Sequence, residues 1–251
     1  MADISGPVVL QYFRKPVVIE NKAGPGAFDP VTKADRAAER AVCKALKAQF
    51  PDHGLIGEEY GTRNPHSRYQ WVVDPIDGTR SFIMGSPLWG TLIGLLEDGE
   101  PVLGLMDQPF TGERIWSDIR ASYLRIRDGV SKRIKTRPCP RMDDAILTST
   151  HPDVFEGPRQ QQALQSLKRS VRMTRYGGDC YGYGLLAAGH VDLIVEAGLK
   201  TYDIAPLIPI IERAGGIVTT WDGGPATAGG NIVAAGDPRV HEAALKLISK
   251  A

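Results

Sequence analysis

The fold is decided by one stretch of the sequence, WVVDPIDGT at residues 71–79. Residues 70–73 form a short apolar run rich in β-branched side chains, which predicts a strand with Asp74 at its end. A proline-containing turn follows, and Asp77 stands three positions after Asp74. We expect this spacing to aim two carboxylates at one point, with the backbone carbonyl of Ile76 facing the same way.

Carboxylate and carbonyl oxygens suit a hard divalent cation, and Mg²⁺ in proteins takes one or two carboxylates together with water and substrate phosphate. No histidine or cysteine lies near the motif, which argues against zinc. Taken alone, DPIDGT also fits a type I turn whose aspartates bond only local amides. Acidic residues at the ends of other predicted elements favour the metal site: Glu58 and Glu59 after Gly57, Glu196, and Asp203 after Tyr202.

The first half of the chain is predicted to contain a long helix and an antiparallel sheet. Thr32 and Asp35 form a variant capping box, after which apolar residues recur at helical spacing as far as residue 50. Further along, apolar runs at residues 91–96 and 101–106 flank an Asp-Gly pair, which is a strong hairpin signal. This pattern indicates antiparallel pairing.

The second half alternates strands and helices, which is typical of an α/β layer. A segment rich in Arg, Lys and Pro at residues 128–145 separates two predicted halves that share one cleft. Residues 1–137 would carry the antiparallel sheet and most metal ligands, and residues 138–251 the substrate pocket and the last metal ligand. The predicted strands are residues 146–148, 191–195, 216–219 and 232–235, and the predicted helices lie near 159–167 and 180–188, from Asp203, and after the cap Asp237-Pro238.

The helix that begins at Asp203 contains two prolines. Asp203 is expected to cap this helix, so that Pro206 falls in the first turn, where its missing N–H has no consequence. Pro209 would then lie inside the helix and kink it.

The overall composition excludes several classes of function. Over 251 residues, apolar residues make up 42% and charged residues 24%, and the formal net charge is +1. Nucleic acid is not expected as a partner, because binding to a phosphate backbone needs a concentrated basic surface. Three isolated cysteines and the lack of a long apolar run predict a cytoplasmic location, with no disulfide framework, membrane span or secretory signal.

These motifs resemble, in order and spacing, those of the inositol monophosphatase family. The resemblance covers nearly the whole chain and is carried by GEE at residues 57–59, WVVDPIDGT at 71–79 and YDIA at 202–205. DPVTKAD at residues 29–35 and AGG at 214–216 add to it. The resemblance implies a mixed α+β fold of the α/β type, a layered αβαβα sandwich like that of the inositol monophosphatases and sugar phosphatases.

The resemblance also implies a set of metal ligands for Mg²⁺, with two or three ions in each active site. The first ion would be held by Glu58, Asp74 and the carbonyl of Ile76. The second would be held by Asp74, Asp77 and Asp203.

Catalytic roles follow from the same resemblance. Thr79 would pair with Glu58 to orient an attacking water, and Asp35 would support the waters on the metals. The amides of Gly78 and Thr79 would bind phosphate, a role that also follows from the free N–H groups at a helix start. The expected mechanism is in-line attack by a metal-activated water, with no covalent phosphoenzyme. A nucleophilic Asp74 is the alternative.

The substrate is suggested by RYGGDC at residues 175–180 and by residues 188–199, which most resemble the histidinol-phosphate phosphatases of this family. Asp179 and Glu196 would line the substrate pocket, with Asp77 and Arg175 as further substrate contacts. Two carboxylates suit a cationic alcohol better than a polyol. The alternatives are that Asp179 only caps a helix, that Glu196 is a plain strand-end residue, and that Arg175 holds a partner subunit.

The sequence therefore predicts a Mg²⁺-dependent phosphatase that converts histidinol phosphate to histidinol and phosphate in histidine biosynthesis. An inositol-1-phosphate phosphatase, or a broader phosphatase of sugar or nucleotide monoesters, is the alternative within the same chemistry. A non-catalytic regulatory protein of this fold is a further alternative. The resemblance favours a homodimer, and the expected partner is a small phosphate monoester.

Overall fold

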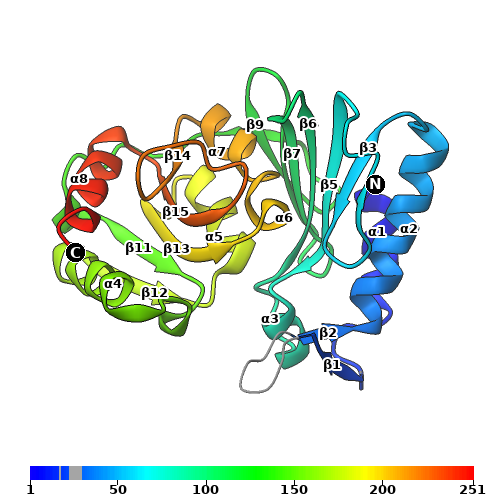
Figure 1. Ribbon diagram of the computed structural model, residues 1–251, viewed down its shortest axis with the longest axis horizontal. Helices are drawn as coiled ribbons and strands as arrows, with labels where there is room; N and C mark the ends of the chain where they lie inside the picture. Colours follow the sequence, from blue (N-terminus) through cyan, green and yellow to red (C-terminus); the bar gives the residue numbers. More distant parts are fainter. Residues whose placement is uncertain (17, 23–29) are drawn as a thin grey trace.

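The computed structural model describes residues 1–16, 18–22 and 30–251. These residues form five layers in the order helix, sheet, helix, sheet, helix (Figure 1). The layered sandwich predicted from the sequence is therefore confirmed. Asp29, the first residue of the DPVTKAD motif, lies outside the described residues.

The larger sheet is built from eight strands: β3 (Gly54–Gly57), β4 (Gly61–Arg63), β5 (Tyr69–Asp77), β6 (Gly90–Glu97), β7 (Glu100–Gln108), β8 (Glu113–Ser117), β9 (Ser122–Ile126) and β10 (Lys132–Ile134). In space they follow the order β10-β9-β8-β7-β6-β5-β3-β4, and all neighbours are antiparallel except β3 and β5. Two helices, α1 (Ala2–Leu10) and α2 (Lys33–Gln49), cover the outer face of this sheet (Figure 1). A short ribbon of β1 (Ile19–Asn21) and β2 (Pro30–Thr32) precedes α2.

The smaller sheet has five strands: β11 (Ile146–Ser149), β12 (Met173–Tyr176), β13 (Leu193–Leu199), β14 (Ile217–Thr220) and β15 (Gly230–Ala235). Their order is β12-β11-β13-β15-β14, with β11 parallel to both of its neighbours. The helices α4 (Gly157–Ser170) and α8 (Pro238–Ile248) cover its outer face, and α5 (Asp179–Ala187), α6 (Thr201–Ile204) and α7 (Ile208–Ala214) lie between the two sheets (Figure 1). The predicted boundary at residue 137 falls in the connection between the two sheets, and we propose it as the division of the chain.

The layer between the sheets is held by apolar packing. Leu92 and Met106 of the larger sheet, Ile210 of α7 and Ile232 of the smaller sheet belong to one core cluster, and each is fully buried. Burial of side chains of this size contributes roughly 1.5–3 kcal/mol each. This packing fixes the ends of β5 and α6 relative to each other, and these ends carry the acidic residues described below.

A glycine lets α6 and α7 approach the larger sheet closely. A Cβ atom on Gly104 of β7 would lie only 1.8 Å from the carbonyl oxygen of Pro206, which links α6 to α7. No side chain fits in that space, so the position of Pro206, and with it that of Asp203, depends on this glycine.

Several local predictions are confirmed. The Thr32 side chain accepts a hydrogen bond from Ala34 N at 3.0 Å, and the Asp35 carboxylate accepts one from Thr32 N at 2.8 Å, so the capping box forms at the start of α2. β6 and β7 form the predicted hairpin. Asp237 caps α8.

Among the described residues, no helix is both long enough and apolar enough to cross a membrane.

Other local predictions are wrong. The sequence predicts Asp74 at the end of its strand, but β5 continues to Asp77. The pairing with β6 is irregular between Asp74 and Asp77, and Asp74 lies inside the strand. The helix expected from Asp203 is divided into α6 and α7, and its cap is Lys200, since the Asp203 carboxylate accepts the Lys200 N–H at 2.7 Å. Pro209 lies in the first turn of α7, where no hydrogen bond is lost, so it causes no kink.

Candidate metal centre and active site

Three carboxylates from two elements form an acidic cluster. Asp74 and Asp77 at the end of β5 and Asp203 of α6 each offer an oxygen within 4.8 Å of the others. A backbone N–H holds each one: Ile76 N lies 3.0 Å from Asp74 Oδ1, Cys180 N lies 2.9 Å from Asp77 Oδ1, and Lys200 N bonds Asp203 as above. The carboxylates are therefore oriented by the backbone before any ligand binds.

Burial and neighbouring negative charges raise the pKa values of the three carboxylates, and a bound cation would favour their ionised forms. Burial raises the pKa of Asp74, and the negative charges of Glu58, Asp77 and Asp203 raise it further. Burial also raises the pKa of Asp77, as does the charge of Asp203 beside it, and burial raises the pKa of Asp203 to about 7. Like charges at this separation repel strongly in a buried site unless a cation lies between them.

The donor atoms fit a hard divalent cation. All three residues of the cluster supply carboxylate oxygens. Cys180 lies nearby, with Sγ 3.8 Å from Asp77 O, but burial and the surrounding carboxylates raise the pKa of its thiol well above the usual value. A thiol that stays protonated is a poor ligand for a soft metal. The site therefore suits magnesium or a similar ion better than zinc.

Glu58 borders the cluster. It follows β3, and its N–H donates to the carbonyl of Val73 on β5 at 3.2 Å. Its carboxylate bonds the ammonium of Lys22 at 2.8 Å, as does that of Glu59. Burial raises the pKa of Glu58, whereas Lys22 and a hydrogen bond with Asp74 lower it.

A buried glutamate that sequence reasoning missed fixes this turn. Glu39 of α2 is fully buried, and its carboxylate accepts the N–H groups of Glu59 at 2.7 Å and Tyr60 at 3.0 Å. Gly57 lies against it so closely that a Cβ atom would stand 2.0 Å from Glu39 Oε1. The one signal in the sequence is an acidic residue on the apolar face of an amphipathic helix.

Thr79 pairs with Asp35 and not with Glu58. The Thr79 hydroxyl lies 3.4 Å from Asp35 Oδ1 and 3.1 Å from the carbonyl oxygen of Ile76. The Glu58 carboxylate bonds Lys22, and the joint orientation of a water by Thr79 and Glu58 stays a prediction. Burial raises the pKa of Asp35 to about 6, so this carboxylate ionises close to neutrality.

The turn that leads from β5 into the short helix α3 (Thr79–Met84) needs glycine. Gly78 has a φ of 92°, and a Cβ atom there would lie 3.0 Å from Leu88 O and 3.1 Å from Asp179 Oδ2. The first N–H groups of a helix have no acceptor within it. The binding of phosphate by the Gly78 and Thr79 amides stays a prediction.

Asp179 lies between the cluster and Glu196, and its negative charge disfavours ionisation of Asp77 on one side and of Glu196 on the other. Asp179 is not the cap of α5, which is Gly178, so the N-cap alternative is wrong. The Asp179 carboxylate accepts a hydrogen bond from Ser81 Oγ at 3.0 Å, and its charge contributes to the raised pKa values of Asp77 and Glu196.

Glu196 is buried within β13, next to an irregular register between Glu196 and Leu199, so it is not a strand-end residue. Its carboxylate accepts hydrogen bonds from Thr150 N at 2.7 Å, Thr150 Oγ1 at 3.1 Å and Ser149 Oγ at 3.4 Å. Burial raises the pKa of Glu196 to about 8. Arg175, by contrast, is exposed on the edge strand β12 and lines an apolar cavity of about 310 Å³ with Leu88, Tyr181 and His190.

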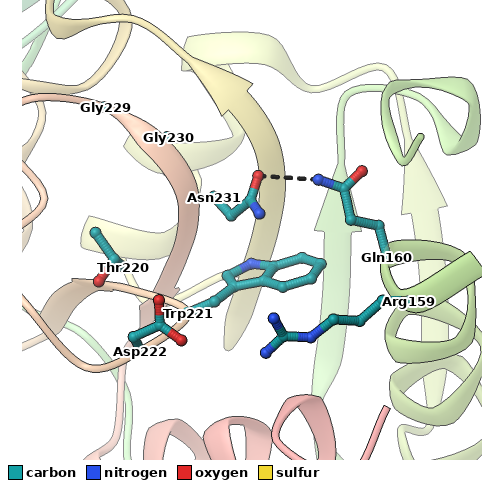
Figure 2. A pocket seen from close by; sticks show the side chains of 8 residues that line it. All are labelled: Arg159, Gln160, Thr220, Trp221, Asp222, Gly229, Gly230 and Asn231. Carbon is teal, nitrogen blue, oxygen red and sulfur yellow. Dashed lines mark hydrogen bonds between the residues drawn. The ribbon is translucent and has the colours of Figure 1, made fainter. Parts of the chain in front are cut away.

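Two polar cavities lie on this side of the smaller sheet and share Gln160. One, of about 520 Å³, is lined by Arg80, which follows Thr79, by Ala197 and Gly198, which follow Glu196, and by Asp153, Glu156 and Gln160. The other, of about 210 Å³, lies between α4 and the loops around β14 and β15 (Figure 2). Gln160 lines both, and its Nε2 donates to Asn231 Oδ1 at 3.2 Å. Sequence reasoning missed Asp153 and Glu156, because no motif surrounds them.

The fold and this site define a phosphatase of a known family. The family model described as the inositol monophosphatase family matches residues 1–251, and the chain belongs to that family. It is 42% identical over 257 aligned residues to the bifunctional phosphatase IMPL2, chloroplastic, of Arabidopsis thaliana, with 98% of this chain and 72% of that protein covered.

Two further comparisons bear on the substrate. A histidinol-phosphatase of Mycobacterium tuberculosis is 34% identical, with 82% of this chain and 79% of that protein covered. The solved structure of an inositol monophosphatase from Zymomonas mobilis superposes with a TM-score of 0.86 at 42% identity, with 99% of this chain and 94% of that chain covered. The comparisons thus include relatives named for each of the two substrates.

Proposed function

We propose that this protein is a Mg²⁺-dependent histidinol-phosphate phosphatase that serves histidine biosynthesis. The observation that carries the proposal is a pair of carboxylates near the cluster of Asp74, Asp77 and Asp203: half-buried Asp179, whose charge acts on Asp77, and buried Glu196, whose pKa Asp179 raises. The cluster would bind the metal ions and the phosphate group. The two further carboxylates would bind a positively charged alcohol.

Glu58, Asp74 and the Ile76 carbonyl would hold one Mg²⁺, and Asp74, Asp77 and Asp203 another. When bound, Mg²⁺ supplies a water of lowered pKa and offsets negative charge on the phosphoryl oxygens. The Asp35 carboxylate can accept the hydrogen bond of the Thr79 hydroxyl at 3.4 Å, so that the Thr79 oxygen is free to orient the attacking water. The amides of Gly78 and Thr79 would bind the phosphate.

The substrate assignment rests on charge. Histidinol phosphate carries an ammonium group and an imidazole that titrates near neutrality. The pKa values of both Asp179 and Glu196 are raised by burial, and a bound cation would favour their ionised forms. Inositol phosphate has no such positive charge, so these carboxylates would have no counter-ion from the substrate in its complex.

We also propose a homodimer and a cytoplasmic location. Strand β12 is an edge strand, and the apolar cavity beside it contains Arg175 and Met173, of which Met173 is 43% exposed. A second copy of the chain would cover this surface, and Arg175 would then contact the partner. All three cysteines are free, which agrees with a reducing compartment.

The test is phosphate release from histidinol phosphate, inositol 1-phosphate and fructose 1,6-bisphosphate, each with and without Mg²⁺. We expect turnover only with the metal and the highest kcat/KM for histidinol phosphate. A higher kcat/KM for inositol 1-phosphate would show that the protein is an inositol-1-phosphate phosphatase instead. A lack of metal-dependent turnover on all three would favour a non-catalytic role.

A further inference from the structure

A cavity of about 390 Å³ lies on the outer side of the larger sheet, between α2 and the edge strand β4. Figure 1 shows α2 running along this side of the molecule, next to β3. The acidic residues of the metal centre do not line the cavity. Its lining residues are Arg40, Cys43, Lys44 and Lys47 of α2, Leu55 of β3, and Tyr60, Gly61 and Arg63 of the turn and strand that follow.

The charged side chains that line this cavity are all positive. Arg40, Lys44 and Lys47 follow one another at spacings of four and three residues, which places them on one side of α2. Arg63 faces them from β4, and no carboxylate is among the lining residues. Within residues 1–16, 18–22 and 30–251, none of these four cations forms an ion pair. A concave surface lined by one sign of charge concentrates ions of the opposite sign.

Arg63 adds a specific unmet hydrogen bond. Its Nε is buried and has no hydrogen-bond partner in the described part of the chain. A buried donor without an acceptor is destabilising, and such groups are rare in folded proteins. Arg63 also lines the cavity, so the other N–H groups of its guanidinium can donate to an oxygen of an anion bound there.

The rest of the lining is apolar. Leu55 is 5% exposed and contributes its side chain to the wall. Burial raises the pKa of the Cys43 thiol to about 11, so the thiol is neutral at physiological pH. The aliphatic stems of Lys44 and Lys47 can cover an apolar ligand while their ammonium groups remain in water. A bare inorganic anion would leave this surface unused.

We propose that this cavity binds a small amphiphilic carboxylate, with its head at Arg63 and its apolar body between Leu55, Cys43 and the stems of α2. The volume is within the range of small-molecule sites. The proposal is independent of the reaction at the metal centre, because it rests on other residues.

The experiment is a titration of the full-length, metal-free protein, followed by isothermal calorimetry and by amide chemical shifts. Three probes separate the contributions: octanoate, octanol, which has the same chain without the charge, and inorganic phosphate, which has charge without a chain. We expect saturable 1:1 binding of octanoate, with chemical-shift changes at Leu55 and Arg63. Octanol and phosphate should bind at least about tenfold more weakly, since each lacks one part of the recognition.

Variants locate the site. Arg63→Met should weaken octanoate binding about tenfold, as should the double variant Lys44→Gln with Lys47→Gln, which changes only exposed side chains of α2. Lys246→Gln on α8, which removes a surface ion pair with Glu242, is the matched control and should bind like the unaltered protein. The proposal is overturned if octanoate does not saturate, if octanol binds equally well, or if both cavity variants keep full affinity while their circular dichroism is unchanged.

Discussion

The carboxylate of Asp77 is held by the backbone of Cys180, with Cys180 N 2.9 Å from Asp77 Oδ1 across 103 residues of sequence. One residue belongs to the end of β5 in the larger sheet and the other to the first turn of α5 between the sheets. The metal centre therefore depends on the packing of the two halves as well as on the DPIDGT motif. The predictions below test this centre and its surroundings.

Asp77→Asn should reduce kcat/KM for the best substrate by more than about a hundredfold at ordinary Mg²⁺, because changes even to residues behind metal ligands cost ten- to a hundredfold. The side-chain amide of the variant has no negative charge with which to bind the metal ion. Steady-state phosphate release measures the effect, and Mg²⁺ titration calorimetry should show weaker binding. Asp98→Asn in the β6–β7 turn is the control and should change neither quantity. Near-normal activity of the Asp77 variant would remove this residue from the metal site.

Asp179→Asn should discriminate between substrates. We expect kcat/KM for histidinol phosphate to fall about ten- to a hundredfold, since a charge-assisted hydrogen bond to the cationic group is lost. Hydrolysis of a simple aryl phosphate, which has no cationic group, should change little. Parallel assays of both substrates on one preparation provide the measurement. Equal losses on both would show that Asp179 supports the turn at Gly78 and does not select the substrate.

Gly57→Ala should destabilise the protein by about 1–3 kcal/mol, the usual cost of overpacking a tight site. The added Cβ would meet Glu39 Oε1 at 2.0 Å, and Glu39 would have to move away from the amides of Glu59 and Tyr60. Urea unfolding measures the change. Gly224→Ala is the matched control, because its nearest contact is 3.3 Å and its cost should be smaller. A Gly57 variant as stable as the control would contradict the proposed fit.

The metal-free protein should lose stability as pH rises from about 4.5 to about 8. Burial raises the pKa of Glu196 from 4.5 to about 8, so in this window the native state binds more protons than the unfolded state. The free energy of unfolding therefore decreases with increasing pH. Urea titrations at a series of pH values provide the measurement, and Glu196→Gln should flatten the curve. An identical pH dependence in the variant would assign the effect to other carboxyls.

The features that could be predicted from the sequence are local in the chain. The Thr32–Asp35 capping box and the β6–β7 hairpin each depend on residues within a few positions of one another, and both are confirmed. Contacts between residues that are distant in the sequence could not be predicted from such local patterns. The hydrogen bonds of Glu39 to the turn after β3 and of Thr79 to Asp35 depend on how α2 lies against the larger sheet.

The errors near Asp203 have a similar cause. Asp203 follows a strand and precedes a proline, a pattern that also fits a helix cap. The structure places it one turn further in, because Lys200 begins α6 and the chain changes direction at Pro206, where it contacts Gly104 of the larger sheet. A contact between residues about a hundred positions apart leaves no local pattern, so the division into α6 and α7 was not predicted.

The contact between Lys22 and Glu58 has a consequence for the order of events at the site. The ammonium lies 2.8 Å from the carboxylate that would coordinate the first metal ion, and it bonds Glu59 at the same distance. A metal ion held by Glu58 would therefore take the place of a cation that the chain already supplies, and Lys22 would keep its bond with Glu59. In the metal-free protein, Glu58 thus already has a counter-ion that comes from its own chain.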